Sequence, residues 1–120
     1  MKSRKVVLIV DDDIDAREVN AVCLRTGSYI AMEASNGRDA LAKMRTVKPD
    51  AVITDMRMPL MDGLKLAMEM KADEALRRVP LGLLTGSPPH DAVEINYFDE
   101  ILLKPCSLDA LLDLASRLTR

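Results

Sequence analysis

Four short apolar runs in this chain each end in a polar or charged residue, and this pattern narrows the folds that the chain can adopt. VVLIV is followed by three aspartates at residues 11–13, AVIT by Asp55, LGLL by Thr85 and EILL by Lys104. Short continuous apolar runs are typical of strands that are buried on both faces of a parallel sheet. The carboxyl ends of such strands meet at one edge, where open α/β sheets bind ligands. We therefore expect these polar side chains to gather in one place.

Amphipathic stretches separate the apolar runs, so the chain alternates strands and helices in the manner of a βαβ protein. The expected strands are Lys5–Val10, Tyr29–Ala34, Ala51–Thr54, Leu81–Leu84 and Ile101–Leu103. The expected helices are Ile14–Thr26, a second helix that follows Asn36 and ends before Pro49, Leu64–Ala75, and a last helix that follows Ser107.

Helix starts and buried faces can also be predicted from residue type and spacing. Side chains expected to cap or favour helix starts are Asp13, Asp15, Asn36, Asp62 and Ser107. The apolar face of the first helix is predicted to hold Ile14, Val19, Val22 and Cys23, and that of the third Leu64, Ala67, Met68 and Lys71. The predicted face of the second helix is Ala40, Leu41 and Met44, and that of the last is Leu108, Leu111, Leu112, Ala115 and Leu118.

The stretch between the fourth and fifth strands is a poor helix former. Two consecutive prolines in Ser87-Pro88-Pro89-His90 favour extended or turn backbone. Only Asp91–Tyr97 remains for a helix, so we expect a short or irregular fourth helix.

Composition excludes several functional classes. With 120 residues the chain has room for one domain, and a net charge of −2 gives no sign of a nucleic-acid surface. No apolar stretch approaches the roughly 20 residues of a membrane span, and no secretory signal opens the chain. Cys23 and Cys106 are too few for a disulfide framework, so we expect two buried thiols in a reducing cytoplasm.

The aspartates after the first and third strands suggest a metal site. Carboxylates held close together repel each other unless a proton or a cation intervenes. Mg²⁺ is a hard cation that prefers oxygen ligands and needs few of them from the protein. Asp11, Asp12 and Asp55 are therefore candidate metal residues.

The motifs VLIVDDD, TDMRMPLMDG, LLTG and ILLKP occur in that order at the ends of successive strands. With them the chain resembles a response regulator receiver domain of the CheY-like superfamily over essentially all of residues 1–120. The resemblance implies a flavodoxin-like, doubly wound, five-stranded parallel sheet with strand order 2-1-3-4-5.

The resemblance also implies roles for the site residues. Asp55 matches the aspartate that accepts a phosphoryl group, and Asp12 matches the direct Mg²⁺ ligand. Asp11 would act through water or a hydrogen bond, and the backbone carbonyl of Arg57 would be a further ligand. The Thr85 hydroxyl and the Lys104 ammonium would contact the phosphoryl oxygens. Pro105 matches a position that follows a cis peptide bond.

The function implied by the resemblance is phosphoryl acceptance in two-component signalling. A histidine kinase or a histidine phosphotransfer protein would donate the group to Asp55, and the resulting shift near Thr85 would change contacts with an unidentified protein target. Neither nucleic acid nor a membrane is an expected direct partner. We expect no enzyme activity beyond weak self-dephosphorylation, whose rate the Arg57 side chain would alter. If the chain is complete, it would be a stand-alone receiver.

Two features depart from the family pattern. Ile101 occupies the position of the family's switch aromatic, for which Tyr97 or Phe98 is a nearby substitute. The interval from Thr85 to Lys104 is also short for a full helix and contains Pro88-Pro89. The usual output surface is therefore expected to be reshaped.

Two other functions compete with this interpretation. A small phosphohydrolase of the haloacid-dehalogenase type would use Asp11 as its nucleophile, because Asp11 and Asp13 form a D-x-D pair after a strand. A receiver-like adaptor would signal by docking alone and never carry phosphate.

Overall fold

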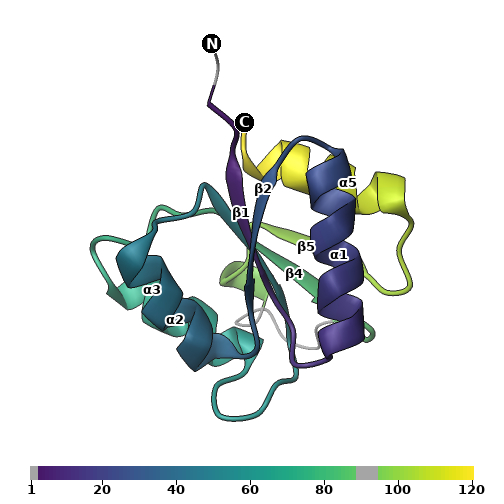
Figure 1. Cartoon of the computed structure of the whole chain (residues 1–120). Coiled ribbons are helices and arrows are strands. Elements are labelled where there is room, and N and C mark those ends of the chain that lie inside the picture. The colour runs from purple at the N-terminus through teal and green to yellow at the C-terminus, as the bar shows by residue number, and fades with distance from the viewer. Residues whose placement is uncertain (1–2, 89–94) are drawn as a thin grey trace.

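Five parallel strands form a single sheet with helices on both faces in the computed structural model, which describes residues 3–88 and 95–120 (Figure 1). The strands are β1 (Val6–Val10), β2 (Ile30–Ala34), β3 (Ala51–Asp55), β4 (Leu81–Thr85) and β5 (Glu100–Leu103). The helices are α1 (Ile14–Thr26), α2 (Gly37–Thr46), α3 (Gly63–Ala72) and α5 (Leu108–Leu118).

The strand order β2-β1-β3-β4-β5 confirms the predicted flavodoxin-like topology. Val10, the last residue of β1, lies beside Ala34 of β2 and Thr54 of β3. At the other side of the sheet Thr85 pairs with Leu103. The strands thus end together at one edge. β1 and β3 are neighbours at the switch point, where the order in which successive strands are added to the sheet changes direction.

Alternate side chains of each strand pack into two separate core layers, because successive residues of a strand point to opposite faces. Val7 and Ile9 face α1 and α5, whereas Leu8 and Val10 face α2 and α3. All four are essentially inaccessible to solvent. Since each fully buried aliphatic side chain contributes roughly 1.5–3 kcal/mol, these layers hold the strand ends in fixed positions.

Four polar side chains cap the helices as predicted. Asp13 accepts a hydrogen bond from the Asp15 amide (3.0 Å), and Asn36 accepts one from the Asp39 amide (2.9 Å). The two remaining caps are Asp62, which accepts from the amide of Lys65 (2.8 Å), and Ser107, which accepts from the amide of Ala110 (3.1 Å).

The predicted buried face of α1 is wrong for three of its four residues. Ile14, Val19 and Val22 are 55%, 67% and 56% exposed, and only Cys23 is buried. The helix instead buries Cys23 together with Ala21 and Leu24 against β2 and α5. Ala21 is small, so it lets the helix pack closely against its neighbours but contributes little to the apolar periodicity of the sequence. The larger side chains of Ile14, Val19 and Val22 therefore dominated the prediction of the buried face.

The predicted face of α3 is also partly wrong. Its buried residues are Gly63, Leu66, Ala67 and Met70, whereas Met68 is exposed. The helix ends at Ala72 instead of Ala75, because the carbonyl of Asp73 accepts hydrogen bonds from the amides of Leu76 and Arg77 in a following turn.

Other predictions have mixed outcomes. Cys23 is buried, and burial raises the pKa of its thiol, but Cys106 is partly exposed because it lies in the loop before α5. The predicted fourth helix, Asp91–Tyr97, lies mostly outside the described residues, as do Pro89 and His90. Within the described ranges, no helix combines the length and apolar character needed to cross a bilayer.

Candidate functional site

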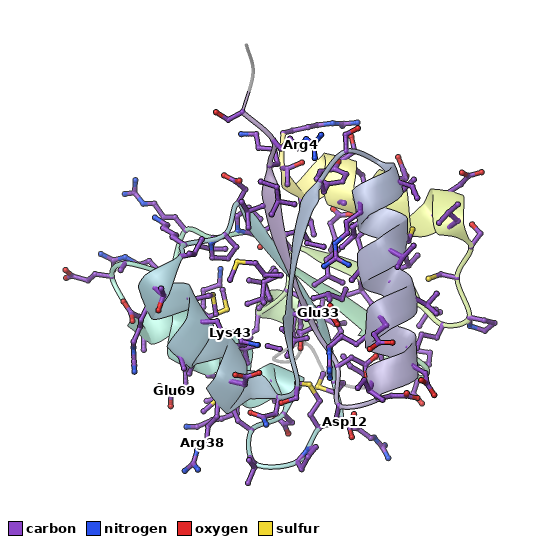
Figure 2. The ribbon with its side chains drawn as sticks, in the orientation of Figure 1. Arg4, Asp12, Glu33, Arg38, Lys43 and Glu69 are labelled. Carbon is purple, nitrogen blue, oxygen red and sulfur yellow. The ribbon has the colours of Figure 1, made fainter. Side chains whose placement is uncertain are left out.

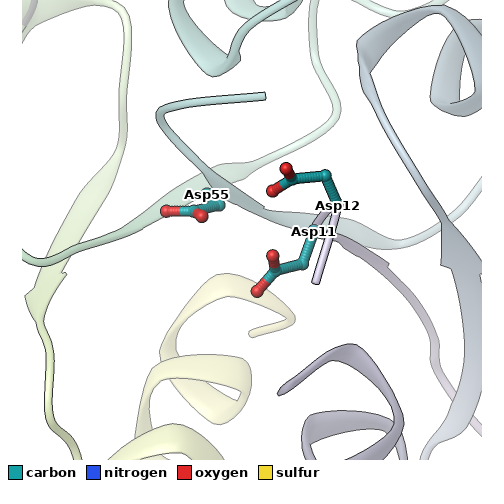
Figure 3. Close-up of side chains that lie close together, drawn as sticks. All are labelled: Asp11, Asp12 and Asp55. Atoms are coloured by element: carbon teal, nitrogen blue, oxygen red, sulfur yellow. The ribbon is translucent and has the colours of Figure 1, made fainter. Parts of the chain in front are cut away.

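Three carboxylates converge at the ends of β1 and β3 (Figure 3). Asp11 and Asp12 directly follow β1, and Asp55 is the last residue of β3. One oxygen from each of the three lies within 4.8 Å of the others. Asp11 is buried and Asp12 is exposed, so the cluster has a closed inner side and an outer side that solvent and ligands can reach.

The ammonium group of Lys104 lies on the inner side of this cluster. Its Nζ is 3.3 Å from Asp55 Oδ1 and 3.8 Å from Asp11 Oδ2. The Lys104 amide donates to the Thr85 carbonyl (2.8 Å), which continues the β4–β5 pairing by one step, and the Lys104–Pro105 peptide bond is cis as the resemblance implied. Lys104 is thus held beside Asp55 by both its backbone and its side chain.

Negative charge exceeds positive charge in the cluster, and the pKa of Asp11 shows the consequence. Burial is the main reason why the pKa of Asp11 is raised, and the charges of Asp55 and Asp12 raise it further. The Asp13 amide, which donates to Asp11 Oδ1 (3.0 Å), and the charge of Lys104 oppose the rise but do not cancel it. A cation at the open side would therefore be attracted to the site.

The carboxylate of Asp55 is fixed by the loop that follows β3. The Met56 amide donates to Asp55 Oδ1 (3.0 Å), and the Gly63 amide donates to the Met56 carbonyl (2.7 Å). A Cβ atom on Gly63 would lie 2.4 Å from the Asp55 carbonyl oxygen. Glycine is therefore required there for α3 to start so close to the end of β3.

Thr85 lies at the matching end of β4, and its side chain is buried. Its hydroxyl donates to the Ser87 carbonyl (3.1 Å) and accepts from the Ser87 amide (3.3 Å). Gly86 is exposed, and a Cβ built on it would have no atom within 4 Å. The backbone at Gly86 thus borders open space.

The donor set fits a hard divalent cation. Asp12 and Asp55 offer carboxylate oxygens, and Asp11 contributes a third within the same short distance. Mg²⁺ is bound by one or two carboxylates and keeps several waters, which an open oxygen-only site permits. The role of the Arg57 carbonyl as a ligand stays a prediction; the side chain of Arg57 is exposed.

A cavity of about 510 Å³ adjoins the acidic cluster. Residues of α1 form one wall, and the other wall includes Lys104, Pro105 and Cys106. Lys104 both lines this cavity and contacts Asp55, so the cavity lies beside the acidic cluster.

The model of the response regulator receiver domain family matches residues 7–116. The chain is a member of this family. The resemblance to receiver domains is therefore confirmed, and members of this family are signalling domains of response regulators instead of enzymes in the usual sense.

Similar proteins agree with this assignment. The phosphate regulon transcriptional regulatory protein PhoB of Pseudomonas aeruginosa is 35% identical over 107 residues, which cover 86% of this receiver domain and 46% of PhoB. The chain thus spans about half the length of that relative.

Two solved structures share the fold over nearly the whole chain. The chemotaxis response regulator CheY4 of Vibrio cholerae has a TM-score of 0.89 at 28% identity and covers 97% of this chain and 99% of its own. TrrA of Thermotoga maritima, solved with Mg²⁺ and BeF, has a TM-score of 0.86 at 30% identity and covers 95% and 98%.

Sequence reasoning missed two residues near the site, Arg17 and Glu33. Arg17 donates to the backbone carbonyl of Asp11 (2.9 Å) and to Glu33 Oε1 (3.2 Å). The available signal was a single acidic residue in the otherwise apolar β2 strand, IAMEA, together with an arginine four residues after the Asp13 cap.

Proposed function

We propose that this receiver domain accepts a phosphoryl group on Asp55. The observation that carries the proposal is a carboxylate at a strand end, 3.3 Å from a lysine ammonium and beside two further aspartates. A carboxylate oxygen of Asp55 would attack the phosphorus of a phosphohistidine. The new O–P bond forms as the P–N bond breaks, and the electron pair leaves with the imidazole nitrogen of the donor.

The other site residues would bind and orient the transferred group. Lys104 places a fixed positive charge where phosphoryl oxygens gather negative charge. Asp12 and Asp55 would hold Mg²⁺, with Asp11 acting through water or a hydrogen bond and the Arg57 carbonyl as a further ligand. Bound Mg²⁺ supplies charge neutralisation at the phosphoryl oxygens. The TrrA complex with Mg²⁺ and BeF supports this assignment by similarity.

Phosphorylation would change the partners of Thr85. Its hydroxyl now bonds to Ser87, and a phosphoryl group on Asp55 offers it stronger acceptor oxygens. Exchange of one partner for the other would pull the β4 end and its following loop inward. The output is then a shift between two packings, which changes contacts with a protein target and not with nucleic acid directly.

The donor would be a cytoplasmic histidine kinase or histidine phosphotransfer protein that approaches along α1. Val19 of α1 is exposed and lines the cavity that Lys104 also lines. Ile14 and Val22 on the same helix and Leu108 at the start of α5 are exposed as well. Apolar residues exposed beside a reactive group favour a protein partner over a small substrate. Residues 1–120 would act as one receiver domain in this reaction.

The test is phosphorylation by a phosphorylated histidine-kinase core in the presence of Mg²⁺, followed by peptide mapping of the labelled aspartate. We expect label on Asp55 in the wild type and none on that peptide in Asp55→Asn. The Asp11→Asn variant serves as the control for the phosphohydrolase alternative. Label at Asp11 that persists in Asp55→Asn would overturn the proposal in favour of that alternative.

The docking-adaptor alternative is tested by metal binding. If the wild type shows no Mg²⁺-dependent shifts in an NMR titration, the adaptor becomes the better explanation. Loss of those shifts in Asp12→Ala, with the fold retained, supports phosphoryl acceptance.

The phosphorylated domain would also lose its phosphoryl group slowly by self-dephosphorylation. Arg57 follows Asp55 by two residues and its side chain is exposed. In the proposed mechanism it would contact a phosphoryl oxygen or screen attacking water. We expect Arg57→Ala to change the phosphate lifetime, measured by decay of the labelled protein; equal decay rates for variant and wild type would remove Arg57 from the mechanism.

A further inference from the structure

A single arginine connects the metal-binding loop to β2 from outside the acidic cluster. Arg17 lies on the first turns of α1, and its side chain is 15% exposed. Its Nη1 donates to the backbone carbonyl of Asp11 (2.9 Å), and its Nε donates to Glu33 Oε1 (3.2 Å). Figure 2 shows Glu33 on β2, beside α1. The two nitrogens of one planar guanidinium thus join two different segments.

The carbonyl that Arg17 binds belongs to the peptide unit between Asp11 and Asp12. The preceding peptide is held by the Asp11 amide, which donates to the Ala34 carbonyl of β2 (3.1 Å). On the other side, the Asp13 amide donates to Asp11 Oδ1 (3.0 Å). Because a peptide unit is planar, a fixed carbonyl also fixes the direction in which the backbone enters Asp12. Arg17 therefore fixes the direction in which the exposed side chain of Asp12 leaves the backbone.

Glu33 in turn determines where the guanidinium lies. It is the one charged residue of β2, and its carboxylate is half-buried between Arg17 and Arg25. A guanidinium offers donors in a rigid fork, so a carboxylate that binds one nitrogen sets the direction of the others. Without Glu33 the Arg17 side chain could turn away from the Asp11 carbonyl into solvent.

We propose that Arg17, oriented by Glu33, is a positioning residue that holds the Asp11–Asp12 peptide in the geometry needed for divalent-cation binding. The inference rests on the magnesium site of the proposed function and adds two residues to it that touch neither metal nor phosphoryl group. Groups that orient a metal ligand from behind typically change metal affinity by 10–100-fold when removed.

Charge and position predict opposite effects of removing Arg17. Arg17 is a cation close to a site that binds a cation, so its removal would tighten Mg²⁺ binding if only charge mattered. The positioning role predicts weaker binding instead. The sign of the change in the dissociation constant therefore distinguishes the two, and a merely structural arginine would give neither effect.

The experiment is an NMR titration of the full chain with MgCl₂, in which amide shifts near residues 11–13 give the dissociation constant. We expect Arg17→Gln to raise the constant about tenfold, and Arg17→Lys, which keeps the charge but loses the fork, to raise it less. Glu33→Gln should raise it severalfold, and the double variant should bind no more weakly than Arg17→Gln alone, because both changes break the same contact chain.

Arg25→Gln is the matched control. Arg25 is also on α1, lies 3.7 Å from the same glutamate, and binds the Ala31 carbonyl instead of Asp11. Its loss removes the same charge from the same carboxylate, and we expect binding equal to or slightly tighter than the wild type. Urea unfolding of every variant in EDTA verifies the fold and separates a general loss of stability from a local effect.

Several outcomes would overturn the inference. One is an Arg17→Gln variant that binds Mg²⁺ as tightly as the wild type or tighter. Another is an equal loss of Mg²⁺ affinity in Arg17→Gln and Arg25→Gln. Wild-type Mg²⁺ affinity in Arg17→Lys would show that the guanidinium fork oriented by Glu33 is not needed, and would overturn the role of Glu33.

Failure of the proposed function looks different, because the wild type itself would then bind no Mg²⁺. Amide hydrogen exchange without metal still tests the positioning role in that case. We expect the Asp11 and Asp13 amides to exchange faster in Arg17→Gln than in Arg25→Gln, and equal rates would count against it.

Discussion

To accept a phosphoryl group, the role proposed for Asp55, a carboxylate needs its negative charge offset while it stays accessible, and the residues around Asp55 meet both needs. Lys104 and the Met56 amide both contact Oδ1 of Asp55, while the open side of the cluster faces Asp12 and solvent. Asp11, Asp12, Asp55, Thr85 and Lys104 were all recognisable from the sequence, because each stands at the end of an apolar run. Arg17 and Glu33 were not, because their importance depends on a contact between α1 and β2 that no local motif carries.

Removing the ammonium of Lys104 separates metal binding from phosphoryl transfer. In Lys104→Met we expect Mg²⁺ to bind more tightly, because a competing cation is lost from the cluster. We expect transfer from a phosphorylated kinase core to slow by on the order of 10²-fold, because a fixed charge on the phosphoryl oxygens is missing. Titration and single-turnover kinetics measure the two effects, and a variant with wild-type transfer rates would contradict the role of Lys104.

Asp39 gives a pH-dependent contribution to stability at the start of α2. Burial tends to raise its pKa, but hydrogen bonds from Ser35 and the charge of Lys43 outweigh burial, so the pKa is lowered. The Ser35 amide donates to Asp39 Oδ2 (3.0 Å), and Lys43 Nζ lies 3.2 Å from the same oxygen. A lowered pKa means that the folded state favours the charged form, so the stabilisation is present above the unfolded-state pKa and is lost as the pH falls through the lower, folded-state pKa.

We therefore expect Asp39→Asn to lower the free energy of unfolding by about 1 kcal/mol at neutral pH. The difference from the wild type should shrink only below the ordinary aspartate pKa of about 3.9. Urea unfolding across this range measures it, and a difference that stayed constant into the acid region would show that the charge of Asp39 is not the cause.

At the scale of elements, strands were easier to predict than the faces of helices. Buried parallel strands are continuous apolar runs, and their ends were correct to within one residue, as with β3, which includes Asp55 as well as Ala51–Thr54. The outer face of α1 carries large apolar side chains, so periodicity alone pointed to the wrong side. The position of the family's switch aromatic was equally hard to predict. Phe98 is buried in the core layer under α2 and α3, and Ile101 is packed against the same layer, which only the tertiary contacts reveal.

The start of α3 is sensitive to substitution, because a Cβ on its first residue, Gly63, would meet the backbone of Asp55. We expect Gly63→Ala to destabilise the domain by roughly 1–3 kcal/mol, since the added Cβ meets a carbonyl oxygen that cannot move without shifting Asp55. Gly86→Ala is the matched control, because a Cβ there meets no atom within 4 Å. Urea denaturation compares the pair, and equal stabilities would show that the β3–α3 loop adapts without cost.

For the whole molecule, the acidic cluster lowers stability, a cost that the proposed Mg²⁺ site would require. Sites that concentrate like charges commonly trade stability for activity. The raised pKa of Asp11 shows that its charged form is disfavoured by folding, so at neutral pH the ionised group subtracts from the stability of the metal-free domain.

Neutralising Asp11 should therefore stabilise the metal-free protein. It should also reduce the extra stability that bound Mg²⁺ gives. We expect Asp11→Asn, which keeps an acceptor for the Asp13 amide, to raise the free energy of unfolding by about 1 kcal/mol in EDTA. The wild type should recover up to about 2.7 kcal/mol when Mg²⁺ reaches 100 times its dissociation constant, and the variant much less. Thermal unfolding with EDTA or MgCl₂ tests this; a variant that is less stable under both conditions would contradict it.

The alternating side chains of β4 have a mechanical consequence. Leu83 belongs to the layer under α2 and α3, whereas its neighbour Leu84 belongs to the layer under α1 and α5. A displacement of the β4 end at Thr85 would therefore act on both core layers. The surface that transmits phosphorylation can therefore differ between relatives that share the same acidic site, because the end of β4 is packed against the helices on both faces of the sheet.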